Sequence, residues 1–93
     1  MYLHIGNGFN VKKKEIIGIF DMDTATVSHN TRAFLSAMEK KKSVSYTEID
    51  IPRSFILCDE KKKANYKIYI SKISAVGLNA RMNSEITEEK QTI

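Results

Sequence analysis

Two carboxylates with a spacing suited to phosphoryl chemistry lie near the start of the chain, at Asp21 and Asp23. They follow the apolar run at residues 16–20 directly, and Thr24 comes next. A first aspartate at the end of a strand can attack phosphorus, and a second one nearby can act as acid or base beside a magnesium ion. The pattern therefore raises a small phosphatase as one hypothesis.

This arrangement resembles the nucleophile motif of haloacid-dehalogenase-type phosphatases. Their chemistry also requires a parallel α/β sheet and, later in the chain, a hydroxyl, a lysine and an acidic metal-binding pair. A chain of 93 residues is too short for that fold, and the acidic pair Asp59 and Glu60 adjoins a lysine triplet in an expected hairpin loop. We therefore interpret residues 21–24 as a polar loop rich in turn formers, and we expect no enzyme activity.

Histidine and cysteine are too sparse to predict a metal site. The two histidines, His4 and His29, have no potential ligand three or four residues further on, and Cys58 is the only cysteine. Structural zinc sites need four such ligands, so we expect neither a metal nor another cofactor. Cys58 ends an apolar run and is expected to be a small core residue, although a nucleophilic pair with a histidine stays open as a tertiary contact.

Lysine triplets dominate the charge of the chain. Nine of the fifteen basic residues fall at residues 12–14, 40–42 and 61–63, and the net charge is +4. Residues 1–82 hold fourteen basic and eight acidic groups, whereas residues 83–93 hold one basic group and three acidic groups. A basic body favours anionic partners, with nucleic acid first and an anionic membrane surface second. The alternative is that the triplets are ordinary solvated loops.

Four of the basic residues stand where a strand is expected to begin. Lys12, Lys13 and Lys14 precede the run at residues 16–20, and Arg53 precedes the run at residues 54–58. Such positions suit contacts to phosphate better than reading of base edges. From composition alone, a basic nucleic-acid-binding module and a soluble structural domain are about equally supported.

The first third of the chain predicts a hairpin followed by a buried strand. Residues 2–5 are expected to pair with residues 10–11 across the turn at Asn7 and Gly8, since both tolerate positive φ. The consecutive apolar residues 16–20 predict a central strand buried on both faces. Residues 21–30 are expected to form a loop.

The remaining pattern predicts helices at two places and further strands. Residues 31–42 predict a helix with Phe34, Leu35 and Met38 on one face and Ser28 or Asn30 as its cap. Residues 43–51 predict a strand, or a strand and an irregular edge, that stops at Pro52. The run at residues 54–58 predicts a second strand buried on both faces, and residues 59–65 a charged hairpin loop.

The C-terminal third predicts a strand and a short helix. In residues 67–71, Ile68 and Ile70 are expected to point inward, and a helix then runs from Ser71 or Ser74 to about Met82. The fold class is therefore α+β, a small and mostly antiparallel sheet with one central helix and a short C-terminal helix. Residues 1–82 form the single domain, and residues 83–93 are expected to be a polar, acidic and disordered tail.

Size and composition limit the possible classes. A domain of 93 residues buries a marginal core, and self-association is a common remedy at this size. No apolar run approaches the length of a membrane helix, and the N-terminus lacks the basic and long apolar regions of a signal peptide. With a single cysteine, a reducing cytoplasm is the expected location.

Several stretches together resemble the RemA/RemB family of bacterial extracellular matrix regulators. The matching segments are residues 1–6, residue 11 with residues 15–21, residues 53–59 and residues 69–74. The resemblance covers about residues 1–82 and consists of ordered apolar strands and small residues without a catalytic signature.

This resemblance implies a small non-enzymatic transcription factor that activates biofilm-matrix genes. Family members form ring-shaped homo-oligomers, with DNA around a basic outer rim, and need no cofactor, membrane or small-molecule substrate. The family's basic residue before the isoleucine-rich strand matches Lys14, with Lys12 and Lys13 adjacent. Its arginine-rich turn matches residues 48–53, which here hold two acids and one arginine, Arg53. The loop at residues 59–65 is also longer than the tight hairpin of the family.

The leading hypothesis is therefore an oligomeric DNA-binding regulator that contacts phosphates through Lys12, Lys13, Lys14 and Arg53. The alternative is a homo-oligomeric protein-interaction module that does not bind DNA, which the acidic residues before Arg53 favour.

Overall fold

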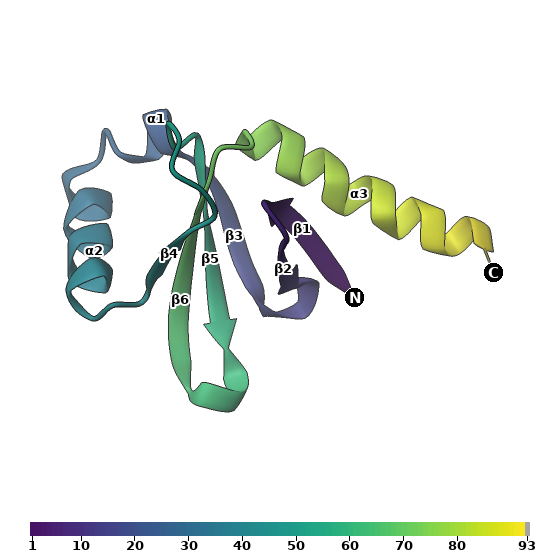
Figure 1. Cartoon of the computed structure of the whole chain (residues 1–93), viewed down its shortest axis with the longest axis horizontal. Coiled ribbons are helices and arrows are strands. Elements are labelled where there is room, and N and C mark those ends of the chain that lie inside the picture. Colours follow the sequence, from purple (N-terminus) through teal and green to yellow (C-terminus); the bar gives the residue numbers. More distant parts are fainter. Residues whose placement is uncertain (93) are drawn as a thin grey trace.

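A four-stranded sheet forms the centre of the molecule, and a separate two-stranded hairpin packs against it (Figure 1). The computed structural model describes the backbone of residues 1–92 and the side chains of residues 1–83. The hairpin is β1 (Tyr2–Gly6) and β2 (Phe9–Lys12); the sheet strands are β3 (Ile16–Asp21), β4 (Val44–Tyr46), β5 (Ser54–Glu60) and β6 (Asn65–Ser71). The helices are α1 (Met22–Ala25), α2 (His29–Lys40) and α3 (Ala75–Thr92).

The sheet has the order β3-β5-β6-β4. Its β3–β5 and β5–β6 pairs are antiparallel, and only the short β4 runs parallel to its neighbour β6. The predicted α+β class, with a mostly antiparallel sheet, a central helix and a C-terminal helix, is confirmed.

The hairpin forms as its turn residues predict. Asn7 and Gly8 both have positive φ, 47° and 79°, which is the geometry that lets a two-residue turn follow the twist of the strands. The resulting register sets Leu3 opposite Val11. Leu3, Ile5 and Val11 are buried as a result, because alternate residues of the two strands face the sheet.

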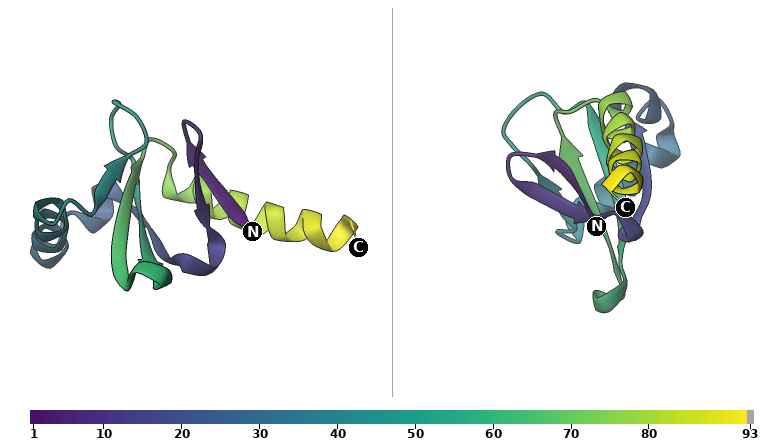
Figure 2. Two further views of the ribbon diagram at one scale, coloured as in Figure 1. Left: turned by 60° about the horizontal axis from the view of Figure 1, so that its bottom comes forward. Right: turned by 90° about the vertical axis from the view of Figure 1, so that its right-hand side faces the viewer.

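Both faces of the sheet are covered, as two views of the ribbon show (Figures 1 and 2). The hairpin and α3 cover one face, and α2 covers the other. The first core is made of Leu3, Ile5, Val11, Ile56, Cys58 and Leu78. The second is made of Met38, Phe55, Ile68 and Ile70. Alternation along β5 supplies both cores, so the predicted burial of this strand on both faces is confirmed.

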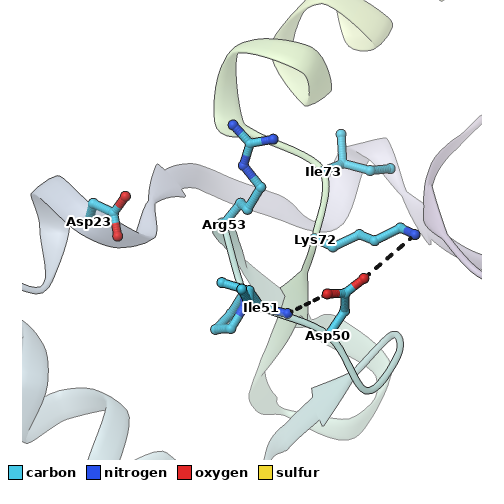
Figure 3. Close-up of a pocket in the computed structure, with 7 residues that line it drawn as sticks. Asp23, Asp50, Ile51, Arg53, Lys72 and Ile73 are labelled. Atoms are coloured by element: carbon cyan, nitrogen blue, oxygen red, sulfur yellow. Dashed lines mark hydrogen bonds and ion pairs between the residues drawn. The ribbon is translucent and has the colours of Figure 1, made fainter.

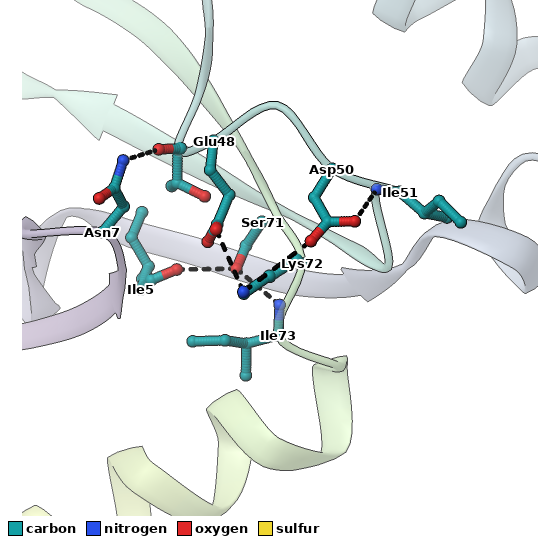
Figure 4. Close-up of polar contacts among 9 residues, drawn as sticks. Ile5, Asn7, Glu48, Asp50, Ile51, Ser71, Lys72 and Ile73 are labelled. Atoms are coloured by element: carbon teal, nitrogen blue, oxygen red, sulfur yellow. Dashed lines mark hydrogen bonds and ion pairs between the residues drawn. The ribbon is translucent and has the colours of Figure 1, made fainter.

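Polar contacts fix the hairpin to the sheet (Figure 4). The buried hydroxyl of Ser71 donates to the Ile5 carbonyl at 2.7 Å, and the Asn7 side-chain amide donates to the Thr47 carbonyl at 2.8 Å. These bonds satisfy backbone carbonyls that no strand partner reaches. The hairpin is thereby held in one orientation on the sheet.

The central position predicted for residues 16–20 is wrong. The strand β3 lies at an edge of the sheet and pairs only with β5. Ile17 is 54% exposed and Phe20 39% exposed. The central positions go to β5 and β6, because their hairpin leaves each of them one free edge, which β3 and β4 then take.

Helix limits differ from the prediction in three places. The expected loop at residues 21–30 contains α1, and α2 spans His29–Lys40 after its Ser28 cap, whose hydroxyl accepts from the Thr31 amide. Phe34, predicted on the buried face of α2, is 40% exposed. The helix α3 reaches Thr92 instead of ending near Met82. The side chains of residues 84–93 lie outside the described part of the chain, and a disordered tail there stays a prediction.

Other local expectations are confirmed. Ile68 and Ile70 are buried, and the strand expected within residues 43–51 is β4 followed by irregular chain. The Ser74 hydroxyl accepts from the Gly77 amide at the start of α3. Over the residues that the structure describes, no helix is both long and apolar enough to cross a membrane.

Candidate nucleic-acid interface

All three lysine triplets lie at the same end of the sheet. Residues 12–14 lead into β3, residues 40–42 lead into β4, and residues 61–63 join β5 to β6. The register links them, because Ile16 pairs with Cys58, Cys58 with Lys67, and Val44 with Ile68. We call this region, the lower side of the sheet in Figure 1, the lysine end.

Charge is unevenly distributed along the sheet. The lysine end holds the nine triplet lysines and Lys67, against four nearby carboxylates: Glu15, Glu39, Asp59 and Glu60. The opposite end of the sheet holds four other carboxylates: Asp21, Asp23, Glu48 and Asp50. Such a distribution gives the lysine end a positive potential that attracts polyanions.

The predicted residues Lys12, Lys13 and Lys14 belong to the lysine end. Lys14 is exposed, whereas Lys12 and Lys13 are half-buried. The Lys13 ammonium donates to the Met82 carbonyl at 3.3 Å, so it also links this end to α3. Lys12 and Lys14 line a hollow of about 330 Å³ together with Met1 and Tyr2.

Arg53, the fourth predicted residue, lies at the opposite end of the sheet. It precedes Ser54, which pairs with Asp21 at the far end of β3. Within the chain, Arg53 is therefore separated from Lys14 by the length of β3, about 20 Å for a six-residue strand. The structure does not bring Arg53 together with the three lysines.

Arg53 shares its end of the sheet with acidic side chains (Figure 3). It lines a shallow hollow of about 580 Å³ with Asp23, Asp50 and Lys72, among others. The Lys72 ammonium lies 3.1 Å from a Glu48 carboxylate oxygen and 3.9 Å from one of Asp50. The two acids that set the turn before Arg53 apart from the family pattern are thus paired with Lys72.

The Asp21 carboxylate has a structural role. Its Oδ1 accepts from the Thr24 amide at 3.1 Å and from the Asp23 amide at 2.9 Å, which caps α1. The Thr24 hydrogen bonds, above all, hold the pKa of Asp21 below its usual value. This geometry agrees with the interpretation of Asp21, Asp23 and Thr24 as turn formers.

Cys58 and the histidines do not form a site together. Cys58 is 1% exposed in the first core, and burial raises the pKa of its thiol to about 12. His4 is exposed on β1, where its Nδ1 lies 3.3 Å from the Asn10 side-chain oxygen. Among the described side chains, no three histidines, cysteines or carboxylates converge as metal ligands would.

Sequence reasoning did not group residues 40–42 and 61–63 with residues 12–14. The feature of the sequence that could have grouped the three triplets is the order of the predicted elements, because successive elements tend to run in opposite directions. If successive elements run up and down, the turns before β3, between α2 and β4, and between β5 and β6 fall at one end. That inference needed the predicted elements to be placed in space and not only along the chain.

Comparison with protein-family models gives no match for this chain, and comparison with curated proteins gives no match either.

Proposed function

We propose that this chain is a DNA-binding protein whose lysine end contacts phosphate groups. It would act as a homo-oligomeric transcription regulator of the kind that the RemA/RemB resemblance implies. One observation carries the proposal: three lysine triplets that are far apart in the sequence share one end of the sheet.

The chemistry of these side chains suits phosphate contacts. Lysine presents a compact positive charge on a flexible stem, which attracts phosphates without fixing the geometry that base recognition needs. The three triplets consist of lysine alone and hold no arginine, the residue that most often reads guanine. One subunit therefore supplies affinity with little sequence selectivity, and an oligomer multiplies that affinity through avidity.

Within this proposal, Lys12, Lys13 and Lys14 remain predicted contacts, and the lysines at 40–42 and 61–63 join them. Arg53 contributes only if a neighbouring subunit brings its own far end to the same DNA. A substitution at Arg53 therefore separates binding by one lysine end from binding across a junction between subunits.

The test compares two variants of equal charge on a generic DNA duplex over a range of salt concentrations. The first, Lys61→Gln with Lys62→Gln, removes two exposed lysines from the lysine end. The second, Arg53→Gln with Lys72→Gln, removes two positive charges from the opposite end. Each lost phosphate contact lowers the log–log salt slope by about 0.9, so the first variant should lose up to about 1.8 and the second very little.

Equal losses in the two variants would mean that only net charge matters, and the lysine end would no longer be a defined interface. A larger loss in the Arg53 variant would place DNA across a junction between subunits. Absence of binding at low salt would remove the proposal.

That last outcome would favour the alternative, a homo-oligomeric protein-interaction module that does not bind DNA. A specific observation supports this second candidate. Ile17 and Phe20 on β3 and Phe34 on α2 are large apolar side chains that are each at least 39% exposed, and patches of this kind mark interaction surfaces.

A further inference from the structure

We propose that a second copy of this chain docks on the free edge of β3, so that the two β3 strands pair antiparallel about a two-fold axis. The proposal concerns the contact between subunits and does not depend on DNA binding.

The edge of β3 is open to a further strand. In the described part of the chain, β3 pairs only with β5, so its other side presents unpaired amide and carbonyl groups. The register of β3 with β5 shifts only at the start of the strand, between Ile16 and Gly18, and residues 18–21 pair regularly. Monomeric proteins protect such edges with charge, proline, β-bulges or very short strands. The opposite edge of this sheet follows that rule, because β4 has three residues. The strand β3 has six residues, and its sequence IIGIFD has a charge only at the last one.

Apolar side chains accompany this open edge. Ile17 is 54% exposed and lies where the register with β5 shifts, between Ile16 and Gly18. Phe20 stacks on Phe55, with ring centroids 4.9 Å apart, and still leaves 39% of its surface exposed. Phe20 also lines a groove of about 250 Å³ together with Phe34 on α2. A partner that pairs with β3 would cover Ile17 and Phe20.

Charge complementarity identifies the partner as a second copy in antiparallel orientation. Residues 12–15, three lysines and Glu15, precede β3 with a net charge of +2, and Asp21 and Asp23 stand at its end. Antiparallel pairing brings the start of one β3 beside the end of the other, so each lysine cluster meets an aspartate pair at two symmetric places. Opposite charges across paired strands stabilise the pairing.

Pairing of β3 with the edge strand β4 of another copy is disfavoured by the same charges. Because β3 and β4 both run parallel to β6 within the sheet, a continued sheet would set residues 12–14 beside residues 40–42 of the next copy. Two lysine triplets would then repel each other. An isologous contact uses one edge twice, so it also differs from the heterologous contact that a closed ring repeats; a ring would need another surface.

A charge exchange tests the contact through the mass of the assembly in sedimentation. The unchanged protein should have twice the chain mass of 10.6 kDa, or a multiple of that dimer. Lys14→Glu and Asp23→Lys should each raise the dimer dissociation constant on the order of tenfold, because the two-fold axis repeats each repulsion. The two changes together in one chain should restore the dimer, since every opposed pair is then reversed.

The control for this exchange is Lys41→Glu, an exposed charge reversal near β4, which should leave the dimer unchanged. A stronger assembly in that variant would point to pairing of β3 with β4 and overturn the proposal. A monomeric unchanged protein, or a double variant weaker than both single variants, would overturn it as well.

Cross-linking gives an independent measurement. In a dimer of Ile17→Cys, the two copies of residue 17 should be offset by about three residues along the paired strands, which separates them by about 10 Å. A short bismaleimide can join two thiols at that distance. The native Cys58 is buried and should not react. Ile17→Cys should give covalent dimers, whereas Val76→Cys, an even more exposed position on α3, should give none. Monomers only from Ile17→Cys, or equal yields from both variants, would contradict the pairing.

Discussion

A single buried thiol responds to pH in a direction that its surroundings determine. Cys58 is 1% exposed, and burial raises the pKa of its thiol to about 12, with the Glu15 and Glu60 carboxylates adding to the effect. An unfolded cysteine has a pKa of about 8.5. Above that pH the unfolded chain loses the proton while the folded chain keeps it, so the free energy of unfolding must fall as pH rises.

We therefore predict that the protein loses stability progressively from about pH 8.5 toward pH 12. Urea unfolding of the native chain and of Cys58→Ala, at neutral and alkaline pH, measures the effect. The alanine variant should start less stable, because it leaves a cavity, but should show a shallower decline with pH. The burial of Tyr69 also raises its pKa, so some decline should remain. Identical slopes in the two proteins would contradict the role given to Cys58.

Individual residues whose role depends on near neighbours could be predicted from the sequence. Asn7 and Gly8 form the turn, Ile68 and Ile70 point inward, and Cys58 is a core residue. Each of these outcomes depends on local backbone preference or on alternation along one strand. The exposure of Phe34 could not be predicted in this way, because it depends on how closely α2 approaches the sheet.

The helix α3 packs against both the hairpin and the sheet, and Leu78 is its fully buried apolar side chain in the described part of the chain. Leu78 is fully buried in the same core as Leu3, Ile5 and Ile56. Leu78→Ala should lower the free energy of unfolding by about 2–5 kcal/mol, as truncations of buried leucines do. The matched control is Val76→Ala, two residues away and 80% exposed, which should change stability by about 0.5 kcal/mol or less.

Chemical denaturation of both variants measures this difference. A loss at Leu78 no larger than that at Val76 would mean that α3 is not docked on the hairpin in solution. The fold would then depend on the sheet and α2 alone.

At the scale of elements, the sequence predicts which segments form strands better than it predicts where they lie in the sheet. The apolar run at residues 16–20 was expected to be central, yet β3 is an edge strand. An edge strand that pairs with another chain has the same apolar composition as a strand with a neighbour on each side. The order of the strands also depends on pairings between residues far apart in the chain. The helix α1 was missed because four residues are too few for a periodic pattern.

The same limit applies to the candidate interface. Lys12, Lys13 and Lys14 could be singled out from the sequence, because they precede a strand. Their common end with the lysines at 40–42 and 61–63, and the separation of Arg53 from them, follow only from the register of the sheet.

At the scale of the whole molecule, the uneven distribution of charge along the sheet and the proposed two-fold pairing of β3 together determine how a dimer would meet DNA. Antiparallel β3 strands direct the two lysine ends of a dimer away from each other. In the proposed dimer, residues 12–14 face the aspartates of the other copy, and residues 40–42 and 61–63 of each lysine end are left for the proposed DNA contacts. The dimer should therefore hold two duplexes together. The nine triplet lysines of one lysine end account for a salt slope of at most about 8, at 0.9 per phosphate contact, and Lys67 can add one contact more.

The last prediction is that the protein retains a labelled duplex on beads that carry a second, unlabelled duplex. Two variants that weaken the β3 contact, Ile17→Glu and Asp23→Lys, should still bind one duplex in solution but retain several-fold less of the labelled one. These variants change the net charge in opposite directions, so a shared loss of bridging cannot come from charge alone. If the native protein binds DNA with a slope well above about 8 and bridges nothing, several lysine ends must follow one duplex. That result would favour the continuous track of a ring over a dimer with opposed lysine ends, because only a ring could align many subunits along a single DNA.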